Sequence, residues 1–240
     1  MLETIMDRRF ENVRAVAFDA DDTLWENEPL FREAESRWAE VLKDYGTEEE
    51  LSARLYEMEE ANMPTLGYGA KAFTISLIST AVSLAGRSLD GDMTARILDA
   101  GLSILRNPCN PMPGVRETLG AIRSSGLYRM ILLTKGDLLD QKMKVGRSGL
   151  SDFFDLVEIV SDKNADEYAR ICAREGIMIE EFLMVGNSFK SDIKPVLDLG
   201  GNGIFIPFRI TWEHEKTEEF DHPRLVRAGS FTELADILLP

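Results

Sequence analysis

The sequence predicts an α/β protein in which a doubly wound parallel sheet carries an inserted, all-helical block. Strand and helix patterns alternate from residue 110 onward, which is typical of repeated βα units with helices on both faces of a parallel sheet. A short apolar strand near the amino terminus ends in two carboxylates. Residues 27–108, between these two parts, contain only helical patterns.

The first strand covers residues 13–18, Val-Arg-Ala-Val-Ala-Phe, and is rich in small and β-branched residues. Asp19 and Asp21 follow directly at its carboxyl end, where open α/β sheets bind ligands. Two crowded carboxylates cost free energy unless a cation or a proton compensates them. The pair therefore indicates either an exposed strand end or a site for a metal and for chemistry.

The alternating part continues to the carboxyl terminus. We expect further strands over residues 128–134, 156–160, 182–186 and 203–206, the last of these closing the set. Between them we expect helices over 113–123, 136–149, 164–175 and 190–199. Ser230 to Glu233 has the capping-box pattern that opens a final helix.

The inserted block begins with helical spacing of apolar residues from Phe31 to Leu42. Thr47 to Glu50 is a second capping box, and two further helices follow over 71–84 and 93–105. Three prolines within residues 107–113 stiffen the return linker. We therefore divide the chain into an α/β core, residues 1–26 and 109–240, and a helical insert, residues 27–108.

Composition narrows the function classes. The chain has 240 residues, a net charge of −15 and 44% hydrophobic residues, which suits a soluble globular protein but not a nucleic-acid binder. The amino terminus has no signal-peptide pattern and no apolar run approaches membrane-spanning length, so we expect a cytoplasmic protein with no membrane partner. Two cysteines far apart are typical of reduced thiols, and two histidines cannot build a His-rich zinc site.

Four predicted strands end in polar groups that parallel strands would bring to one edge of the sheet. Asp19 and Asp21 follow the first, Thr134 and Lys135 the second, Lys163 the third, and residues 186–192, Gly-Asn-Ser-Phe-Lys-Ser-Asp, the fourth. Together they offer a nucleophile, positive charge, an acid/base and metal ligands, which are the parts that phosphoryl transfer needs.

With these four segments in this order, the chain resembles the haloacid dehalogenase superfamily over nearly its whole length. The likeness is to the metal-dependent phosphatases with a helical cap inserted after the first strand of a Rossmann-like core. Asp19 to Thr23 matches the first family motif, Thr134 the second, Lys163 the third and residues 186–192 the fourth. A single one of these matches is weak, but four in order at strand ends are specific.

The resemblance implies a role for each matching residue. Asp19 would attack phosphorus, and Asp21 would protonate the leaving alcohol and then activate water. Thr134 and Lys163 would bind phosphoryl oxygens. Asp19, the Asp21 carbonyl and Asp192 would hold Mg²⁺, the implied cofactor. The implied substrate is a small phosphorylated metabolite, bound by a monomer or homodimer.

Two positions depart from the family pattern. Asn187 stands where many relatives carry an acidic residue, so it could reach the metal only through an amide, without charge. Lys135 follows Thr134 where Asn is frequent and adds a second cation near the phosphate. The presence of Asp21 favours a phosphatase over the superfamily's dehalogenases, which have no alcohol leaving group to protonate.

Alternatives stay open at this point. A mutase or a phosphonate-cleaving enzyme would keep the fold, and Lys71 in the cap is a candidate substrate-binding or Schiff-base lysine. A phosphate-ester or protein-binding module with little turnover is a different class, for which Asn187 is the only hint. Trp25 could line the pocket or pack at the hinge, and His214 is interpreted as a surface-loop residue.

Overall fold

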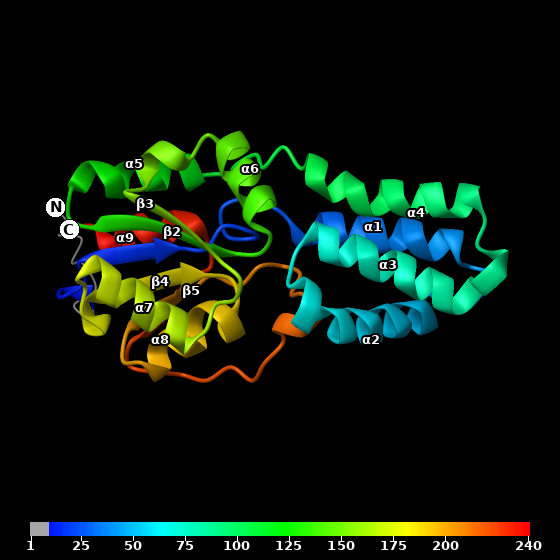
Figure 1. Cartoon of the computed structure of the whole chain (residues 1–240). Helices are drawn as coiled ribbons and strands as arrows, with labels where there is room; N and C mark the ends of the chain where they lie inside the picture. Colours follow the sequence, from blue (N-terminus) through cyan, green and yellow to red (C-terminus); the bar gives the residue numbers. More distant parts are fainter. Residues whose placement is uncertain (1–9) are drawn as a thin grey trace. The chain divides into compact units, whose positions relative to one another are not determined.

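The computed structural model describes residues 10–240 and contains a six-stranded parallel sheet (Figure 1). The strand order is β3-β2-β1-β4-β5-β6, with β1 in the middle. The strands are β1 Ala15–Phe18, β2 Arg129–Lys135, β3 Leu156–Val160, β4 Phe182–Gly186, β5 Asn202–Phe205 and β6 Leu225–Arg227. This arrangement confirms the predicted fold class.

The register of the sheet brings the carboxyl ends of the central strands level. Phe18 at the end of β1 pairs with Leu132 of β2 on one side and with Val185 of β4 on the other. Residues that follow these three positions therefore emerge at one edge of the sheet. This edge is where Asp19, Thr134 and Asn187 lie.

Helices cover both faces of the sheet. Successive residues of each strand point to opposite faces, so neighbouring residues pack against different helices. Helices α5 (Val115–Ser125) and α9 (Leu234–Leu238) pack with Phe18 and its neighbours on one face. Helices α7 (Ala165–Glu175) and α8 (Lys194–Asp198) pack with Ala17 and its neighbours on the other. Strands buried on both faces explain why the sequence shows continuous apolar runs.

Three sequence expectations about the carboxyl-terminal part are wrong in detail. The strand near residue 203 is not the last, since β6 pairs with β5 beyond a long connection. The helix expected over 190–199 is a π-helical turn, Phe189–Ile193, followed by α8. The Ser230 side chain does not cap a helix amide: it bonds Glu233 Oε1, and the segment opens as a 3₁₀ turn.

The inserted block is four helices around their own core. They are α1 Glu28–Val41, α2 Glu48–Leu66, α3 Ala70–Ala85 and α4 Gly91–Ser103, and the core includes the fully buried Trp38. The capping box at Thr47 is present as predicted: its hydroxyl accepts from Glu50 N, and the Glu50 carboxylate accepts from Thr47 N.

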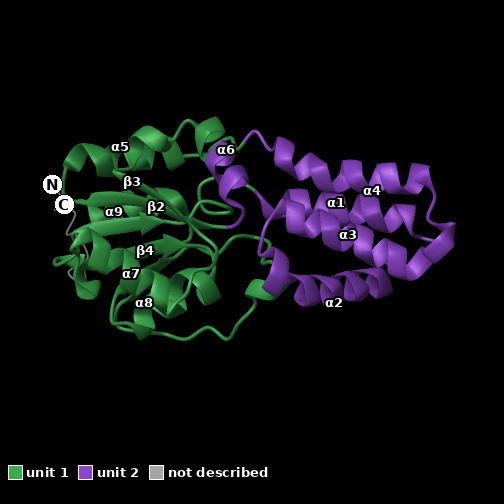
Figure 2. Ribbon diagram, in the orientation of Figure 1, with its two compact units in different colours: residues 1–26, 109–135, 145–240 green, residues 27–108, 136–144 purple. Residues whose placement is uncertain are grey.

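The chain divides into two compact units, coloured separately in Figure 2. The helical unit contains residues 27–108 and also 136–144, the first part of α6 (Leu138–Ser148). Residues 136–144 join it through Lys71 Nζ, 2.8 Å from Asp137 Oδ1, and through Lys144 Nζ, 2.8 Å from Asn27 Oδ1. The sheet unit contains the remaining residues.

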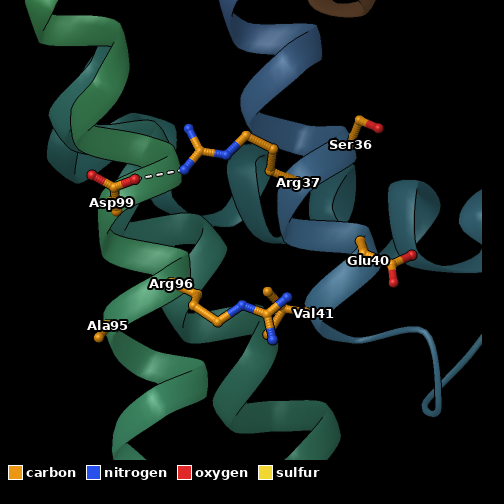
Figure 3. A pocket seen from close by; sticks show the side chains of 7 residues that line it. All are labelled: Ser36, Arg37, Glu40, Val41, Ala95, Arg96 and Asp99. Carbon is orange, nitrogen blue, oxygen red and sulfur yellow. Dashed lines mark hydrogen bonds and ion pairs between the residues drawn. The ribbon is translucent and has the colours of Figure 1, made fainter.

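Within the helical unit, a groove of about 580 Å³ lies between α1 and α4. Figure 3 shows Arg37 reaching from α1 to Asp99 of α4, 2.6 Å away, so one ion pair spans this groove. No helix within residues 10–240 is long and apolar enough to cross a membrane.

Candidate active site

Asp19 is the buried centre of a cluster in the sheet unit. It follows β1 directly, and only 7% of its surface is exposed. Its two carboxylate oxygens have different partners: Oδ1 lies 2.5 Å from Lys163 Nζ, and Oδ2 accepts a 2.9 Å hydrogen bond from the Thr23 hydroxyl. The side chain is therefore fixed at both oxygens.

Lys163 reaches Asp19 from the segment after β3 and lies between two carboxylates. Its Nζ is 2.7 Å from Asp192 Oδ1 as well as 2.5 Å from Asp19 Oδ1. Burial opposes the charge of this ammonium, but the two carboxylates outweigh it and raise the pKa of Lys163 above its ordinary value. One ammonium facing two carboxylates leaves the trio with a net negative charge.

The pKa of Asp19 reflects both its burial and this surplus of negative charge. The pKa of Asp19 is raised to about 7: burial is the largest influence and raises it, Lys163 lowers it, and the charges of Asp192 and Asp21 raise it. A buried carboxylate is stabilised by a bound proton or by a nearby cation. The cluster thus has an electrostatic demand for one more positive charge.

Asp21 is held by a buried indole. The Trp25 Nε1 donates to Asp21 Oδ1 at 2.7 Å, and Trp25 is fully buried. The backbone between them is tight: Asp22 has φ +62°, and its N–H donates to the Trp25 carbonyl at 2.7 Å. This turn folds Trp25 back beside Asp21. Asp21 itself lies two residues after Asp19.

The loop after β4 brings the fourth motif to the same cluster. Gly186 has no side chain to occupy the space that the Asp192 carboxylate fills, since a Cβ there would lie 2.2 Å from Asp192 Oδ2. The same oxygen accepts from Ser188 N at 2.9 Å. Both Asp192 oxygens are thus engaged, one by Lys163 and one by the loop backbone.

Asn187 places an amide oxygen among other oxygens. Its Oδ1 lies 3.1 Å from Thr23 Oγ1, 3.2 Å from Asp19 Oδ2 and 3.2 Å from the Asp21 carbonyl oxygen. Oxygens that converge in this way are stabilised by an amide turned to present its NH₂, whose two N–H groups have these three oxygens as acceptors, or by a cation among them.

The donor set fits a hard cation. A carboxylate, a backbone carbonyl and an amide oxygen are the ligand types that Mg²⁺ takes in proteins. Within residues 10–240, no group of three or more His, Cys, Asp or Glu side chains is placed to hold a metal. Asn187, Asp19 and the Asp21 carbonyl are the residues that could bind Mg²⁺.

Lys135, at the end of β2, is engaged on the side of the loop. Its Nζ forms an ion pair with Glu215 and donates to the Ser191 hydroxyl at 2.9 Å. Burial raises the pKa of Glu215, but Lys135 and two serine hydroxyls outweigh it and hold that pKa below its usual range. Thr134, the preceding residue, is 1% exposed.

Several of the residues singled out in the sequence are in direct contact. Asp19, Lys163 and Asp192 form a chain of charges, and Asn187 joins it at Thr23. Lys71 belongs to the helical unit, where it pairs with Asp137, and a substrate-binding role for it stays a prediction. His214 lies in the same short turn as Glu215 and stacks edge-on with Trp212 at 4.7 Å.

Sequence reasoning missed three contributions. The Thr23 hydroxyl was within the first motif but had been given no role, although its four-residue spacing from Asp19 was a usable signal. The bond from Trp25 to Asp21 has the same spacing. Glu215 had no signal, because it follows β5 by a loop and lies far in sequence from its partners.

Comparison with known proteins places this geometry in a family. A family model described as haloacid dehalogenase-like hydrolase matches residues 13–200. A solved structure of a haloacid dehalogenase-like family hydrolase from Xanthomonas campestris is 36% identical, with a TM-score of 0.83, over 95% of this chain and 91% of that one. At 17% identity, the L-2-haloacid dehalogenase from Xanthobacter autotrophicus shares the fold, with a TM-score of 0.58 over 92% of this chain and 96% of that one.

Curated relatives carry a named activity. The glyceraldehyde 3-phosphate phosphatase of Methanothermobacter thermautotrophicus is 26% identical over 83% of this chain and 88% of its own length. The protein of the same name from Methanocaldococcus jannaschii is 26% identical over 94% of this chain and 97% of its own length. The family model covers more than half of the chain, and the chain therefore belongs to the haloacid dehalogenase-like hydrolases.

Proposed function

We propose that this protein is a Mg²⁺-dependent phosphatase that hydrolyses a small phosphomonoester through an aspartyl-phosphate. One observation carries the proposal: a buried carboxylate, Asp19, is oriented at both oxygens, while a second carboxylate, Asp21, is held two residues away by Trp25. Two carboxylates held by different partners suit two different roles, one as nucleophile and one as acid/base.

In the first half of the reaction, an Asp19 oxygen bonds to phosphorus and the bond from phosphorus to the alcohol oxygen breaks. Asp21 gives its proton to that oxygen, so the product leaves as a neutral alcohol. In the second half, Asp21 takes a proton from a water molecule, whose oxygen bonds to phosphorus. The acyl-phosphate bond breaks, inorganic phosphate is released and the Asp19 carboxylate is regenerated.

The phosphoryl oxygens need positive charge and donors around them. Lys163 is the cation that already contacts Asp19, and it favours the ionised form that attack requires. Thr134 lies on the neighbouring strand at the same edge of the sheet and would donate its hydroxyl. Lys135 is paired with Glu215, so its predicted contact with substrate would require it to share or leave that partner.

Asp19, the Asp21 carbonyl and Asn187 would hold Mg²⁺, with Asp192 supporting them through Lys163. The ion would supply charge neutralisation for the phosphoryl group and for the surplus carboxylate. The predicted role of Asp192 as a ligand would require one of its two engaged oxygens to change partner. A metal-free site would keep the Asn187 amide turned the other way, where the two N–H groups of its NH₂ have the same three oxygens as acceptors.

The fold is shared with dehalogenases, so the reaction must be argued from the site. Release of halide from carbon needs no protonated alcohol, and a second carboxylate on the leaving-group side has no task there. Asp21 is present and oriented by Trp25. This favours a phosphate ester over a haloacid as substrate.

Curated relatives suggest where to look for the substrate. Three that match over 76–94% of this chain are named glyceraldehyde 3-phosphate phosphatases. At 26% identity this supports a small phosphorylated metabolite, and we propose that the protein acts on such compounds in the cytoplasm.

The test is phosphate release from a panel of small esters, glyceraldehyde 3-phosphate included, with and without Mg²⁺. Asp19→Asn is the blank, and Asp152→Asn, an exposed acidic position in the sheet unit, is the matched control. We expect Mg²⁺-dependent release that Asp19→Asn abolishes and Asp152→Asn keeps. Acid quenching followed by peptide mass spectrometry should find phosphate on Asp19.

Other outcomes point elsewhere. Turnover that persists in Asp19→Asn would contradict the covalent mechanism. Transfer of phosphate within an ester, without release, would indicate a mutase. Inactivation by borohydride in the presence of a phosphonate would indicate a Schiff base, with Lys71 the first residue to examine. Tight ester binding without any product would indicate a binding module.

A further inference from the structure

Glu215 belongs to none of the four strand-end motifs, yet its side chain reaches the segments that carry two of them. It lies in the short turn Glu213–Glu215 after β5, and its side chain is 11% exposed. Its carboxylate accepts from the Ser188 hydroxyl and from the Ser191 hydroxyl, the latter at 2.7 Å, and pairs with Lys135 Nζ.

The two serines belong to the loop that presents Asn187 and Asp192. Ser188 Oγ accepts from Ser191 N at 3.0 Å, so the serines also brace one another. Each hydroxyl has one proton, and both protons go to Glu215. A carboxylate that accepts from two hydroxyls and one ammonium acts as the common acceptor for the whole loop.

The loop needs such support because of its conformation. Residues Phe189–Ile193 form a π-helical turn, a form that is rare and is kept where surrounding contacts favour it. On the other side, the Tyr168 hydroxyl donates to the Ser191 carbonyl at 2.9 Å. Tyr168 holds the loop through its backbone, whereas Glu215 holds it through its side chains.

Glu215 also balances a charge next to the site. Lys135 follows Thr134, and its side chain is 16% exposed, so an unpaired ammonium here would be costly and would repel a nearby divalent cation. Paired with Glu215, Lys135 adds no net charge. Lys163 is then the ammonium whose charge acts on Asp19.

We propose that Glu215 is a positioning residue: it fixes the loop that carries Asn187 and Asp192, and it neutralises Lys135, so that the oxygens around Asp19 keep the placement that a divalent cation requires. The proposal rests on the proposed function, since it concerns the metal and phosphate site of that reaction. It assigns to Glu215 no contact with substrate.

The test compares Glu215→Gln with Glu158→Gln. Glu158 lies on the edge strand β3. It is a suitable control because its side chain is 14% exposed and is paired with Arg170 and Arg174 of α7. The first readout is the Mg²⁺ concentration at half-maximal thermal stabilisation, which needs no turnover. The second is kcat and KM for an accepted ester at low and saturating Mg²⁺.

We expect Glu215→Gln to raise the half-maximal Mg²⁺ concentration about tenfold or more, whereas Glu158→Gln stays within about twofold of the wild type. Saturating Mg²⁺ should recover most of the lost kcat, which a merely structural defect would not allow. A midpoint for Glu215→Gln within twofold of the wild type would overturn the proposal, as would the same shift in both variants.

Two further variants cover a failure of Glu215→Gln to fold. Ser191→Ala removes one hydroxyl and no charge, and should raise the Mg²⁺ midpoint by a smaller factor. The double variant Lys135→Met/Glu215→Gln removes both charges together with the acceptor of the loop, and should raise the Mg²⁺ midpoint above that of the wild type. If neither variant shifts the midpoint from that of the wild type, Glu215 does not position the site.

The positioning and the reaction can fail separately. A wild type that turns over esters, with an unmoved midpoint in Glu215→Gln, would contradict the positioning alone. A moved midpoint in a protein that releases no phosphate from any ester would contradict the reaction alone. A wild type that Mg²⁺ does not stabilise would overturn both the metal assignment and the role of Glu215.

Discussion

Trp25 and Asp21 are joined by a 2.7 Å hydrogen bond from the indole Nε1 to Oδ1, within a turn that buries the indole completely. The bond fixes the carboxylate that we propose as acid and base. A general acid must be held within hydrogen-bond reach of the oxygen it protonates, so this relationship bears directly on rate.

Replacing Trp25 tests this orientation. We expect Trp25→Phe to lower kcat about 10- to 100-fold with little change in KM, because Asp21 loses its donor while substrate contacts remain. The control is Trp38→Phe, which also removes a buried indole N–H, here one that donates to the Leu77 carbonyl at 3.0 Å in the helical unit. Both variants should lose comparable stability in thermal unfolding. Equal kcat values for the two variants would show that the indole bond does not orient Asp21.

Restoring a charge at Asn187 tests the metal site. We expect Asn187→Asp to lower the half-saturating Mg²⁺ concentration about tenfold, since a carboxylate adds negative charge among the oxygens that already converge. Without Mg²⁺, the same change should destabilise the protein, because the amide no longer donates to them. Asn62→Asp adds the same charge in α2 and serves as the control. Unchanged Mg²⁺ binding in Asn187→Asp would remove residue 187 from the metal site.

The raised pKa of Asp19 predicts how stability depends on pH. Its pKa is about 7 in the folded protein against 3.8 for an ordinary aspartate, so the folded state binds this proton more tightly than the unfolded state. The favourable contribution is complete below pH 3.8 and is lost as the pH rises through 7. Asp19→Asn does not titrate, and its free energy of unfolding relative to the wild type should rise between pH 4 and 8, by no more than about 4 kcal/mol.

The measurement is urea unfolding of both proteins at several pH values with a chelator present. Mg²⁺ should reduce the difference at pH 8, because a bound cation stabilises the ionised carboxylate of the wild type. Activity should fall as the pH drops and Asp19 takes up a proton, and higher Mg²⁺ concentrations should move this fall to lower pH. A stability difference that is flat from pH 4 to 8 would mean that Asp19 is ionised throughout.

Gly186 tests the packing of the loop on the strand. A Cβ at this position would lie 2.2 Å from Asp192 Oδ2 and 2.4 Å from its Cγ. Gly186→Ala should therefore displace Asp192 from Lys163 and lower kcat at least 100-fold, with a loss of stability of about 1–3 kcal/mol. Gly120→Ala, in α5, is the control, because a Cβ at this position would lie at an ordinary contact distance, 3.6 Å, from Phe153. If Gly186→Ala retains wild-type kcat, the contact between residues 186 and 192 has no bearing on catalysis.

Much of the fold could be predicted because local rules and burial agree. Strands β3 and β4 begin and end where the apolar runs do, and the capping box at Thr47 begins α2 as its pattern requires. Ser230 shows the limit: the same pattern of residues bonds side chain to side chain in a 3₁₀ turn. The three-residue strand β6 carries too short an apolar pattern to be distinguished from a loop.

For the candidate site, the sequence predicts which residues come together but not how they contact one another. Asp19, Lys163 and Asp192 were found because parallel strands bring their carboxyl ends to one edge, a consequence of topology that the order of elements already implies. The direction of each oxygen was not implied. Which oxygen of Asp19 meets Lys163 and which meets Thr23 depends on how three loops pack.

The sequence by itself determined the first five strands, the inserted helices and the identities of the groups at the strand ends, because hydrophobic periodicity is encoded locally. The tertiary structure alone decided that Trp25 holds Asp21, that the Asn187 amide faces three oxygens and that Glu215 pairs with Lys135 across 80 residues of sequence. Hydrogen bonds and ion pairs depend on distances of a few tenths of an ångström and on direction. No pattern of residue types fixes those distances until the chain has packed.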